Sequence, residues 1–369
     1  MEKKKVLFIG RLPPPIHGAA NANKRYITSK LLNDSFKIES VQINLPSNLD
    51  LVGKFGFKKL FWTAKSYLNL LKKLIFFNPD MIYFEIAPKG IAFFRDSIYV
   101  FICKLFNKKI LFQFHAKGAK KFANTKIKKA YYKFTFRKTK ATLLSNILYH
   151  DVQEFIPREN VYILPDTIKD EITEIFFHKI NKKRERNNKT QLLFLSNMIE
   201  SKGPIEVLKI CSELKKQNIK FNCSFVGKFH DTSFEKKFLG KIKRYKLEKS
   251  CKYLGPKYGE EKEKILENTN YLIFPTKYPE ETFGRVILEA FMYGVPVLSY
   301  NNGAIKEIIS KNYLGFVSEK SKWKELAIEL SKRLKVKENH KKVREHFNKF
   351  FASDVPEKGM LEIWQKETA

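Results

Sequence analysis

The chain has 369 residues, 43% of them hydrophobic, and a formal net charge of +33. This length exceeds what one hydrophobic core ordinarily supports, so we expect two domains. The charge indicates acidic partners such as nucleic acid, anionic lipid or phosphorylated ligands, although a general excess of solvated lysines explains it as well. No lysine-free apolar run reaches the roughly 18 residues of a membrane span, which excludes an integral membrane protein.

The cysteines and the N-terminal segment indicate a cytoplasmic protein. Cys103, Cys211, Cys223 and Cys251 have no paired spacing, so we expect reduced, buried thiols rather than a disulfide framework or a zinc site. In MEKKKVLFIGRLPPP the basic start precedes an apolar run that is too short for a signal peptide. We therefore predict a soluble or membrane-surface protein.

Short β-branched and aromatic runs alternate with longer helical patterns along the chain. In the N-terminal part the strand-like runs are 5–10, 36–44, 80–86, 109–115, 141–145 and 160–165. The segment 166–190 is polar and charged without a lasting period, which predicts an inter-domain linker. Strand-like runs resume at 191–197, 221–227, 251–255, 270–275, 295–300 and 314–318, and the pattern is helical from about 320 onwards.

This alternation predicts two α/β domains in tandem, each with a doubly wound parallel sheet. We place an N-terminal domain at 1–167, the linker at 168–189 and a C-terminal domain at 190–350. A C-terminal helix at 351–369 would return to the N-terminal domain. Ligands bind such sheets at the carboxyl ends of the strands, here in the cleft between the domains.

The stretch YPEETFGRVILEAFMYGVPVLSY, residues 278–300, carries the clearest functional pattern. Phe283 and Gly284 stand where a turn opens a helix, and unpaired N–H groups there favour an anion that glycine lets approach closely. Glu289, inside the helix, suits a sugar diol, and Glu281 can reach hydroxyls beyond the phosphates. On local features alone, a capping role for Glu281 and a solvated Glu289 stay open.

The stretch resembles the signature of the family-four (group 1) retaining glycosyltransferases. The pattern of Glu, Phe-Gly, a second Glu after seven residues, Ala and Gly-x-Pro-Val corresponds to Glu281, Phe283, Gly284, Glu289, Ala290, Gly294, Pro296 and Val297. The resemblance implies the GT-B fold, with two Rossmann-like domains facing a central cleft. It also implies a nucleotide-diphosphate-sugar donor, most often a UDP- or GDP-sugar, and neither a metal nor a cofactor.

Weaker matches implicate further residues. The resemblance implies that Lys202, in LSNMIESKG, binds the diphosphate, that Gly18, in PPPIHGAANA, lies near the donor phosphate and that His115, in FQFHAKG, is an active-site histidine. A structural histidine and a glycine needed only by a tight turn are the alternatives. The family's usual arginine five residues before the lysine is Asn197 here, and Arg285 is the candidate for the missing charge unless it points to solvent.

The expected site combines these residues in two roles. Glu281, holding the donor sugar, and His115 are the catalytic candidates, and Glu289 would hold the ribose. The donor-binding candidates are Gly18, Asn197, Lys202, Phe283, Gly284, Arg285 and Glu289.

The N-terminal half contains basic helical patterns. Between Ser97 and His150 there is no acidic residue, and Lys126, Lys129, Lys133, Arg137 and Lys140 form one helical stripe, with Ile127, Tyr131 and Phe134 on another face. In 57–77, Lys58, Lys65 and Lys72 lie opposite Leu60, Ala64, Leu71 and Ile75. We predict peripheral contact with an anionic inner membrane. The alternative is that the apolar faces pack on the sheet.

The resemblance implies a retaining glycosyltransferase, with an acceptor-binding N-terminal domain and a nucleotide-sugar-binding C-terminal domain. It would move a sugar to a glycan or a lipid-linked glycan in bacterial surface polysaccharide synthesis, such as capsule, O-antigen or lipopolysaccharide. It would act in the cytoplasm, on the inner face of the membrane. A GT-B epimerase or hydrolase acting on nucleotide-sugars is one alternative. A basic nucleic-acid-binding protein is the other, although no motif for nucleic acid is visible.

Overall fold

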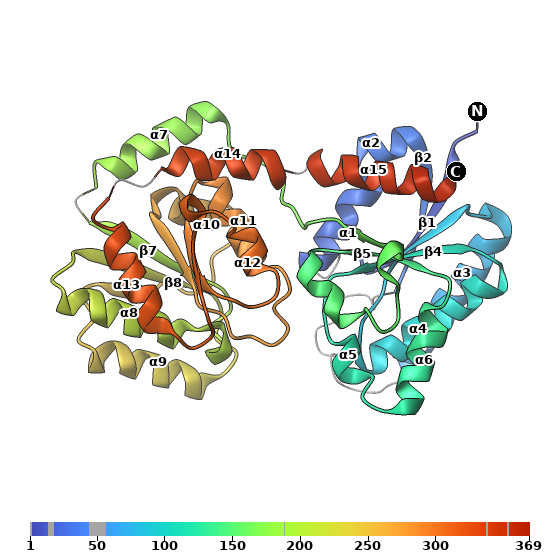
Figure 1. Cartoon of the computed structure of the whole chain (residues 1–369), viewed down its shortest axis with the longest axis horizontal. Helices are drawn as coiled ribbons and strands as arrows, with labels where there is room; N and C mark the ends of the chain where they lie inside the picture. The colour runs from blue at the N-terminus through green and yellow to red at the C-terminus, as the bar shows by residue number, and fades with distance from the viewer. Residues whose placement is uncertain (1, 14–17, 44–56, 188, 337–338, 353) are drawn as a thin grey trace. The chain divides into compact units, whose positions relative to one another are not determined.

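The computed structural model describes residues 2–13, 18–43, 57–187, 189–336, 339–352 and 354–369 (Figure 1). The chain divides into two compact units. The N-terminal unit comprises Met1–Asp166 together with Asp354–Ala369, and the C-terminal unit is Thr167–Ser353. Each unit contains one six-stranded sheet in which all neighbouring strands are parallel. The predicted fold class, two α/β domains with parallel sheets, is confirmed.

The sheet of the N-terminal unit has the strand order β2-β1-β3-β4-β5-β6. Its strands are β1 (Lys4–Gly10), β2 (Phe36–Gln42), β3 (Met81–Glu85), β4 (Lys109–Phe114), β5 (Lys140–Leu143) and β6 (Val161–Ile163). Its helices are α1 (Gly18–Thr28), α2 (Lys30–Ser35), α3 (Phe57–Lys72), the π-helical turn η2 (Lys73–Phe77), α4 (Gly90–Leu105), α5 (Ala119–Phe122), α6 (Lys126–Phe136), the 3-10 turns η3 (Asn146–Asp151) and η4 (Arg158–Asn160), and α15 (Asp354–Thr368).

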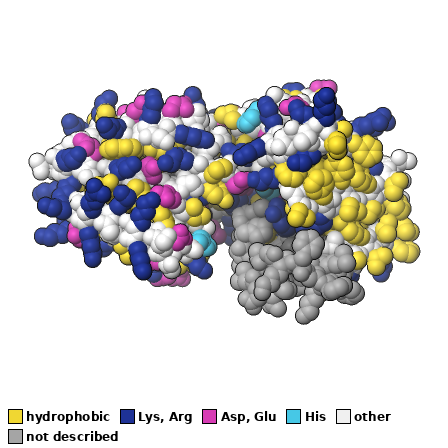
Figure 2. Space-filling view, turned by 90° about the horizontal axis from the view of Figure 1, so that it is seen from below, with side chains coloured by type: hydrophobic (Ala, Val, Ile, Leu, Met, Phe, Trp, Pro, Cys, Tyr) yellow, Lys and Arg dark blue, Asp and Glu magenta, His cyan; other side chains and the backbone are white. Residues whose placement is uncertain are grey.

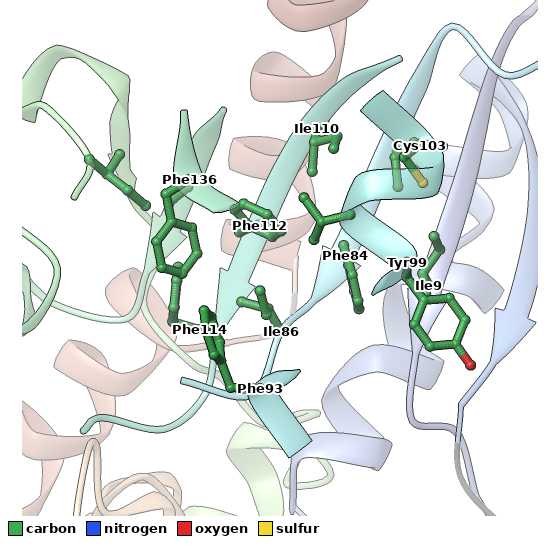
Figure 3. Packing of buried hydrophobic residues seen from close by; sticks show 14 of the residues in the cluster. Ile9, Phe84, Ile86, Phe93, Tyr99, Cys103, Ile110, Phe112, Phe114 and Phe136 are labelled. Carbon is green, nitrogen blue, oxygen red and sulfur yellow. The ribbon is translucent and has the colours of Figure 1, made fainter. Parts of the chain in front are cut away.

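Strand residues of this unit point alternately to two apolar clusters, because successive side chains of a strand face opposite sides. Leu7 and Ile9 of β1 belong to the cluster covered by α3, α4 and α6, in which the aromatic rings of Figure 3 pack. Val6 and Phe8 belong to the cluster on the other face, which α1, α2 and α15 cover. Burial on both faces explains why these strands read as continuous apolar runs.

Helix α15 is part of the N-terminal unit although it ends the chain. Trp364 is completely buried, and its ring meets Phe36 and Tyr83 edge-on at centroid distances of 5.5 and 5.4 Å. At the end of the helix, Glu367 pairs with Lys140 of β5 at 2.8 Å. A tryptophan that fills the centre of one apolar cluster joins the C-terminus firmly to this sheet.

We expect Trp364→Ala to destabilise the N-terminal unit by about 3–5 kcal/mol, because truncating a buried aromatic side chain leaves a cavity. Differential scanning calorimetry of the whole chain would show the change as a lower melting temperature for one transition. Trp62→Ala, at a side chain that is 41% exposed, is the matched control and should change little. Unchanged melting of Trp364→Ala would contradict the packing of α15.

The sheet of the C-terminal unit has the order β12-β11-β10-β7-β8-β9. Its strands are β7 (Thr190–Leu195), β8 (Phe221–Val226), β9 (Cys251–Tyr253), β10 (Tyr271–Phe274), β11 (Val297–Tyr300) and β12 (Gly315–Ser318). Its helices are α7 (Glu174–Glu185), the turn η5 (Glu200–Lys202), α8 (Pro204–Lys216), α9 (Thr232–Arg244), α10 (Gly259–Asn268), α11 (Arg285–Met292), α12 (Ile305–Ile308), the turn η6 (Asn312–Leu314), α13 (Trp323–Arg333) and α14 (His340–Phe350).

The segment 168–189, predicted to be a linker without a period, contains helix α7 and lies in the C-terminal unit. Phe177, Ile180 and Arg184 are the buried residues of α7. These three positions have helical spacing, but an apolar pattern cannot be recognised in the sequence because the third residue is a charged arginine. The Arg184 guanidinium donates hydrogen bonds to the carbonyl groups of Leu266, Glu267 and Tyr293 at 2.7–2.9 Å, which satisfies it inside the unit.

Two further helix predictions need correction. The basic stripe of 126–140 is not one helix, because α6 ends at Phe136 and Lys140 begins strand β5. In the helix of 57–77 the structure buries Leu70, Leu74 and Phe77, whereas Ile75, predicted on the apolar face, is exposed. Lys58 and Leu60 lie in α3, but their side chains are outside the described part of the structure. None of the helices described combines the length and apolar character of a membrane span.

Candidate functional site

A pocket of about 290 Å³ lies at the carboxyl ends of the strands in the C-terminal unit. Leu195, Val226 and Phe274, the last residues of β7, β8 and β10, are in its wall. Polar groups gather at such an edge because the strands are covered by helices elsewhere. The pocket brings together six of the predicted site residues: Asn197, Lys202, Glu281, Gly284, Arg285 and Glu289.

Gly284 opens helix α11 in a left-handed conformation, with φ 77° and ψ 59°. No side chain caps this helix start, so N–H groups of its first turn are available to a ligand. Gly284, Arg285 and Val286 all line the pocket. An L-residue at position 284 would be strained, because such φ values favour glycine. The helix start is therefore suited to an anion.

Lys202 and Glu281 form an ion pair at 2.7 Å in the pocket wall. Their side chains are only 15% and 10% exposed, and the Lys202 ammonium lies 4.3 Å from the ring centroid of Tyr278. The pair and the aromatic ring hold the lysine in one place. A phosphate entering the pocket would therefore meet a positioned charge, and would share it with Glu281.

Glu289 projects from α11 and pairs with Lys262 of α10 at 2.9 Å. Its side chain is partly exposed toward the pocket, not fully solvated. A carboxylate held at one oxygen by a lysine still offers acceptor sites to a pair of hydroxyl groups. This geometry suits a ligand with two adjacent hydroxyl groups, and Lys262 positions the carboxylate.

Sequence reasoning missed four basic or aromatic residues of the pocket: Lys228, Lys257, Tyr258 and Lys262. Lys228 lies shortly after strand β8, and Lys257 and Tyr258 lie shortly after β9. Their position just after strand-like runs is the sequence feature that could have identified them. With them, five basic side chains and two carboxylates line the pocket, which makes it electropositive overall. Gly227 is required in its floor, because a Cβ there would lie 1.8 Å from the carbonyl oxygen of Ser196.

Phe283, predicted to bind the donor, does not bring its side chain into the pocket. The ring is buried in the C-terminal unit and lies edge-on to Phe351 at 6.4 Å. An apolar residue next to a helix start is buried here because α11 packs against α14. The motif thus includes one residue that supports the helix and does not line the pocket.

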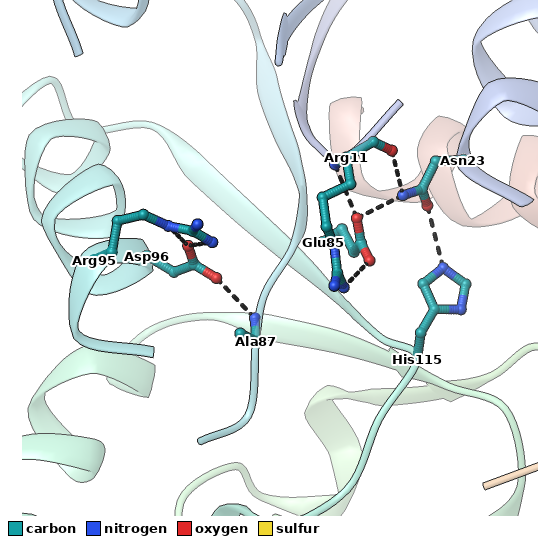
Figure 4. A network of polar contacts seen from close by, with 7 residues as sticks. All are labelled: Arg11, Asn23, Glu85, Ala87, Arg95, Asp96 and His115. Atoms are coloured by element: carbon teal, nitrogen blue, oxygen red, sulfur yellow. Dashed lines mark hydrogen bonds and ion pairs between the residues drawn. The ribbon is translucent and has the colours of Figure 1, made fainter. Parts of the chain in front are cut away.

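A second cluster of polar residues lies in the N-terminal unit, where β1, β3 and β4 end (Figure 4). Glu85, the last residue of β3, is buried, pairs with the Arg11 guanidinium and accepts a hydrogen bond from the Arg11 amide at 2.9 Å. Asn23 of α1 donates from Nδ2 to Glu85 at 2.6 Å, and its Oδ1 lies 3.1 Å from His115 Nε2. Because the Asn23 amide group donates to Glu85, its oxygen is left to accept a hydrogen from His115.

This network orients His115. Burial opposes ionisation of Glu85, but the charges of Arg11 and His115 and the hydrogen bonds from Arg11 outweigh burial and lower the pKa of the carboxyl group. Gly18, the other predicted residue of this unit, is the first residue of α1. Residues 14–17 of the predicted glycine loop, His17 among them, are outside the described residues.

Within the described residues, three cysteines form a group that could hold a metal ion. Cys211, Cys223 and Cys251, from α8, β8 and β9, have their sulfur atoms within 4.8 Å of one another. All three are buried. Burial raises the pKa of the Cys211 and Cys223 thiols, whereas hydrogen bonds from these two lower the pKa of Cys251 to about 5. Metals bind thiolates, so a metal here would require the two buried thiols to ionise as well. The absence of a metal stays a prediction.

Comparison with known proteins identifies the C-terminal unit. Residues 176–350 match the family model of the glycosyl transferases group 1. This unit is therefore similar to the group 1 glycosyl transferases. A capsule-region protein of Klebsiella pneumoniae, described as an uncharacterized 41.2 kDa protein, is 28% identical over 150 residues. That match covers 35% of this chain and 41% of the Klebsiella protein, so the chain spans about two-fifths of its curated relative.

Solved structures show the same fold over the whole chain. A glycosyltransferase from Rickettsia africae superposes with a TM-score of 0.75, 18% identity and coverage of 100% of this chain and 99% of its own. Anabaena HepE, in complex with UDP and glucose, has a TM-score of 0.70, 16% identity and coverage of 98% and 99%. The lipopolysaccharide outer core galactosyltransferase WaaB has a TM-score of 0.74 and 14% identity, with coverage of 98% of this chain and 99% of its own. The predicted GT-B fold is confirmed.

We expect Glu85 to make stability depend on pH. Its pKa is lower in the folded than in the unfolded chain, so its contribution is complete above the ordinary glutamate pKa of about 4.3 and is lost as the pH falls below it. The free energy of unfolding, from urea titrations, should therefore fall more steeply with acidification in the wild type than in Glu85→Gln. Glu325→Gln, on the exposed side of α13, should keep the wild-type slope. Equal slopes for all three would contradict the network.

Proposed function

We propose that this chain is a group 1 glycosyltransferase that moves a sugar from a nucleotide-diphosphate-sugar, a UDP- or GDP-sugar, to a glycan or lipid-linked glycan acceptor, with retention at the anomeric carbon. One observation carries the proposal. The pocket of the C-terminal unit combines a glycine-opened helix start, a positioned lysine and two separated carboxylates. A diphosphate with a sugar at each end requires these groups in this combination.

In the proposed complex the diphosphate lies at the start of α11, against the N–H groups after Gly284 and the ammonium of Lys202. Arg285, which lines the pocket beside them, would supply the charge that Asn197 lacks. Glu289 would bind the ribose hydroxyls and Glu281 those of the donor sugar. The match to the group 1 model and the similarity in fold to HepE, solved with UDP and glucose, support this arrangement.

The chemistry follows from charge. The bond between the anomeric carbon and the phosphate oxygen breaks, and its electron pair stays on the nucleoside diphosphate, where Lys202 and the helix start stabilise it. The acceptor hydroxyl attacks from the same face, and its proton passes to the departing phosphate oxygen. The proposal therefore assigns no side chain as a covalent nucleophile. His115, oriented by Asn23, is the candidate active-site histidine of the N-terminal unit.

The acceptor class is proposed from relatives. The Klebsiella protein is described as lying in a cps region, and WaaB as a lipopolysaccharide outer core galactosyltransferase. These descriptions support a bacterial surface polysaccharide as the product. A nucleotide-sugar epimerase or hydrolase with this fold would use the same pocket, and analysis of the products separates these reactions.

We expect one nucleoside diphosphate to raise the melting temperature of the wild type when UDP, GDP, ADP and TDP are compared. A ligand at 100 times its dissociation constant adds about 2.7 kcal/mol of stability. Lys202→Ala and Glu289→Ala should lose this shift, and Arg285→Ala should reduce it, whereas Arg285→Lys should keep more of it. Glu248→Gln, at an exposed residue of the same unit outside the pocket, is the control.

Two results would contradict the proposal. Full retention of the shift by Lys202→Ala and Glu289→Ala would move the binding site elsewhere, and full donor affinity of Arg285→Ala would remove its role. The nucleic-acid alternative predicts no specific shift with any diphosphate and a steep salt dependence of binding to oligonucleotides.

We also expect transfer to be independent of metal ions, because the cationic groups of the pocket come from the chain itself. Extensive dialysis against EDTA should leave the transfer rate within about twofold of the untreated enzyme, as positioned cations replace a Lewis acid. Loss of transfer that added Mg²⁺ or Mn²⁺ restores would show that the diphosphate needs a metal.

A further inference from the structure

Helix α4 is apolar on its outer as well as its inner side. Phe93, Val100 and Cys103 face the core, whereas Ile91 and Leu105 on the opposite side are 73% and 82% exposed. Phe94 and Ile98 lie between these two at helical spacing and are also exposed. A helix at the surface of a soluble domain ordinarily carries polar residues on its outer side, so an apolar outer side indicates a further contact.

The neighbouring helices extend this surface. On α6, which packs beside α4, Ile127 is 83% exposed and Phe134 is 57% exposed. The ring of Phe134 lies 5.2 Å from that of Phe101 on α4, so the two helices share one surface. Figure 2 shows hydrophobic side chains gathered on this side of the N-terminal unit. We call these residues the apolar face: Ile91, Phe94, Ile98, Phe101, Leu105, Ile127 and Phe134.

The prediction from sequence placed an apolar side on α6 and left open whether it packs on the sheet. In the structure only one of the three predicted apolar residues, Tyr131, packs against the core, whereas Ile127 and Phe134 are exposed. Exposed apolar patches of this kind on a monomer mark contact with a protein or a membrane.

The charges around the apolar face are almost all positive. Lys126, Lys129 and Lys133 are exposed at the side of the same helix α6, and Arg137, directly after it, is exposed as well. Between Ser97 and His150 the chain has no acidic residue. The carboxylates that flank this segment are engaged within the unit. Asp96 pairs with Arg95, Asp151 accepts hydrogen bonds from the backbone at Gly118, and Glu154 pairs with Lys129 at 2.7 Å.

We propose that the apolar face docks this unit on an anionic lipid surface, with its side chains in the interfacial layer and the lysines of α6 among the headgroups. Apolar side chains bordered by basic ones are complementary to such a surface. A second copy of the chain is a poorer partner, since a two-fold contact would place the same basic residues opposite one another. The proposal rests on this surface alone and is independent of the reaction proposed above.

The test is sedimentation of the full chain with phosphatidylcholine vesicles, with and without phosphatidylglycerol, at low and high salt. We expect binding only to the vesicles that contain phosphatidylglycerol, and weaker binding at high salt. Ile91→Ser/Leu105→Ser should weaken binding at least about tenfold, because two large side chains no longer enter the lipid. Ile328→Ser, at an apolar residue of α13 that is 54% exposed, is the matched control.

A second pair of variants tests the charge. Lys126→Gln/Lys133→Gln should weaken binding, whereas Lys236→Gln/Lys243→Gln, two exposed lysines of α9 in the other unit, should not. Unchanged melting temperatures show that the variants fold. Wild-type protein that stays in the supernatant with anionic vesicles would overturn the proposal. So would α4 and α6 variants that bind like the wild type, or a dimer in sedimentation velocity that these variants dissociate.

Discussion

Both candidate sites depend on one constraint of parallel sheets, which is that strands covered by helices on both faces expose polar groups only where they end. In the C-terminal unit the ends of β7, β8 and β10 border the pocket that holds Lys202 and Glu281. In the N-terminal unit the ends of β1, β3 and β4 border the cluster around Glu85 and His115. Two unrelated sets of residues therefore occupy equivalent positions in two similar sheets.

The charge of each site is controlled by ion pairs that a ligand can share or exchange. Lys202 pairs with Glu281 and Lys262 with Glu289, so the pocket keeps its two carboxylates without excluding an anionic ligand. Such pairs contribute little net stability, but they hold long side chains in defined positions before the ligand arrives. Glu85 differs, because its partners surround it completely and its role is to orient Asn23 and, through it, His115.

Much of this fold and part of its site could be predicted from sequence, for local reasons. Each strand-like run, and the motif around Gly284, is a contiguous stretch of sequence that can be recognised without knowing distant contacts. Because the helix starts at a known place after a strand, the positions of its glycine and of the next N–H groups follow. Contacts between distant residues could not be predicted: Lys262 with Glu289, Asn23 with Glu85, and the three cysteines that meet in one core. Helix α7 was missed because a buried arginine, satisfied by three distant carbonyl groups, looks like a surface residue in the sequence.

The central claim is that the start of helix α11 binds the diphosphate, and amide NMR of the labelled chain during a titration with UDP or GDP tests it most directly. The account predicts the largest shifts at Gly284, Arg285 and Val286, with smaller ones at Gly227 and Lys228 across the pocket. Hydrogen bonds to a phosphate move amide proton resonances strongly, so these signals report the contact itself. Saturable binding that leaves the amides of 284–286 unchanged, or shifts confined to the N-terminal unit, would contradict the account.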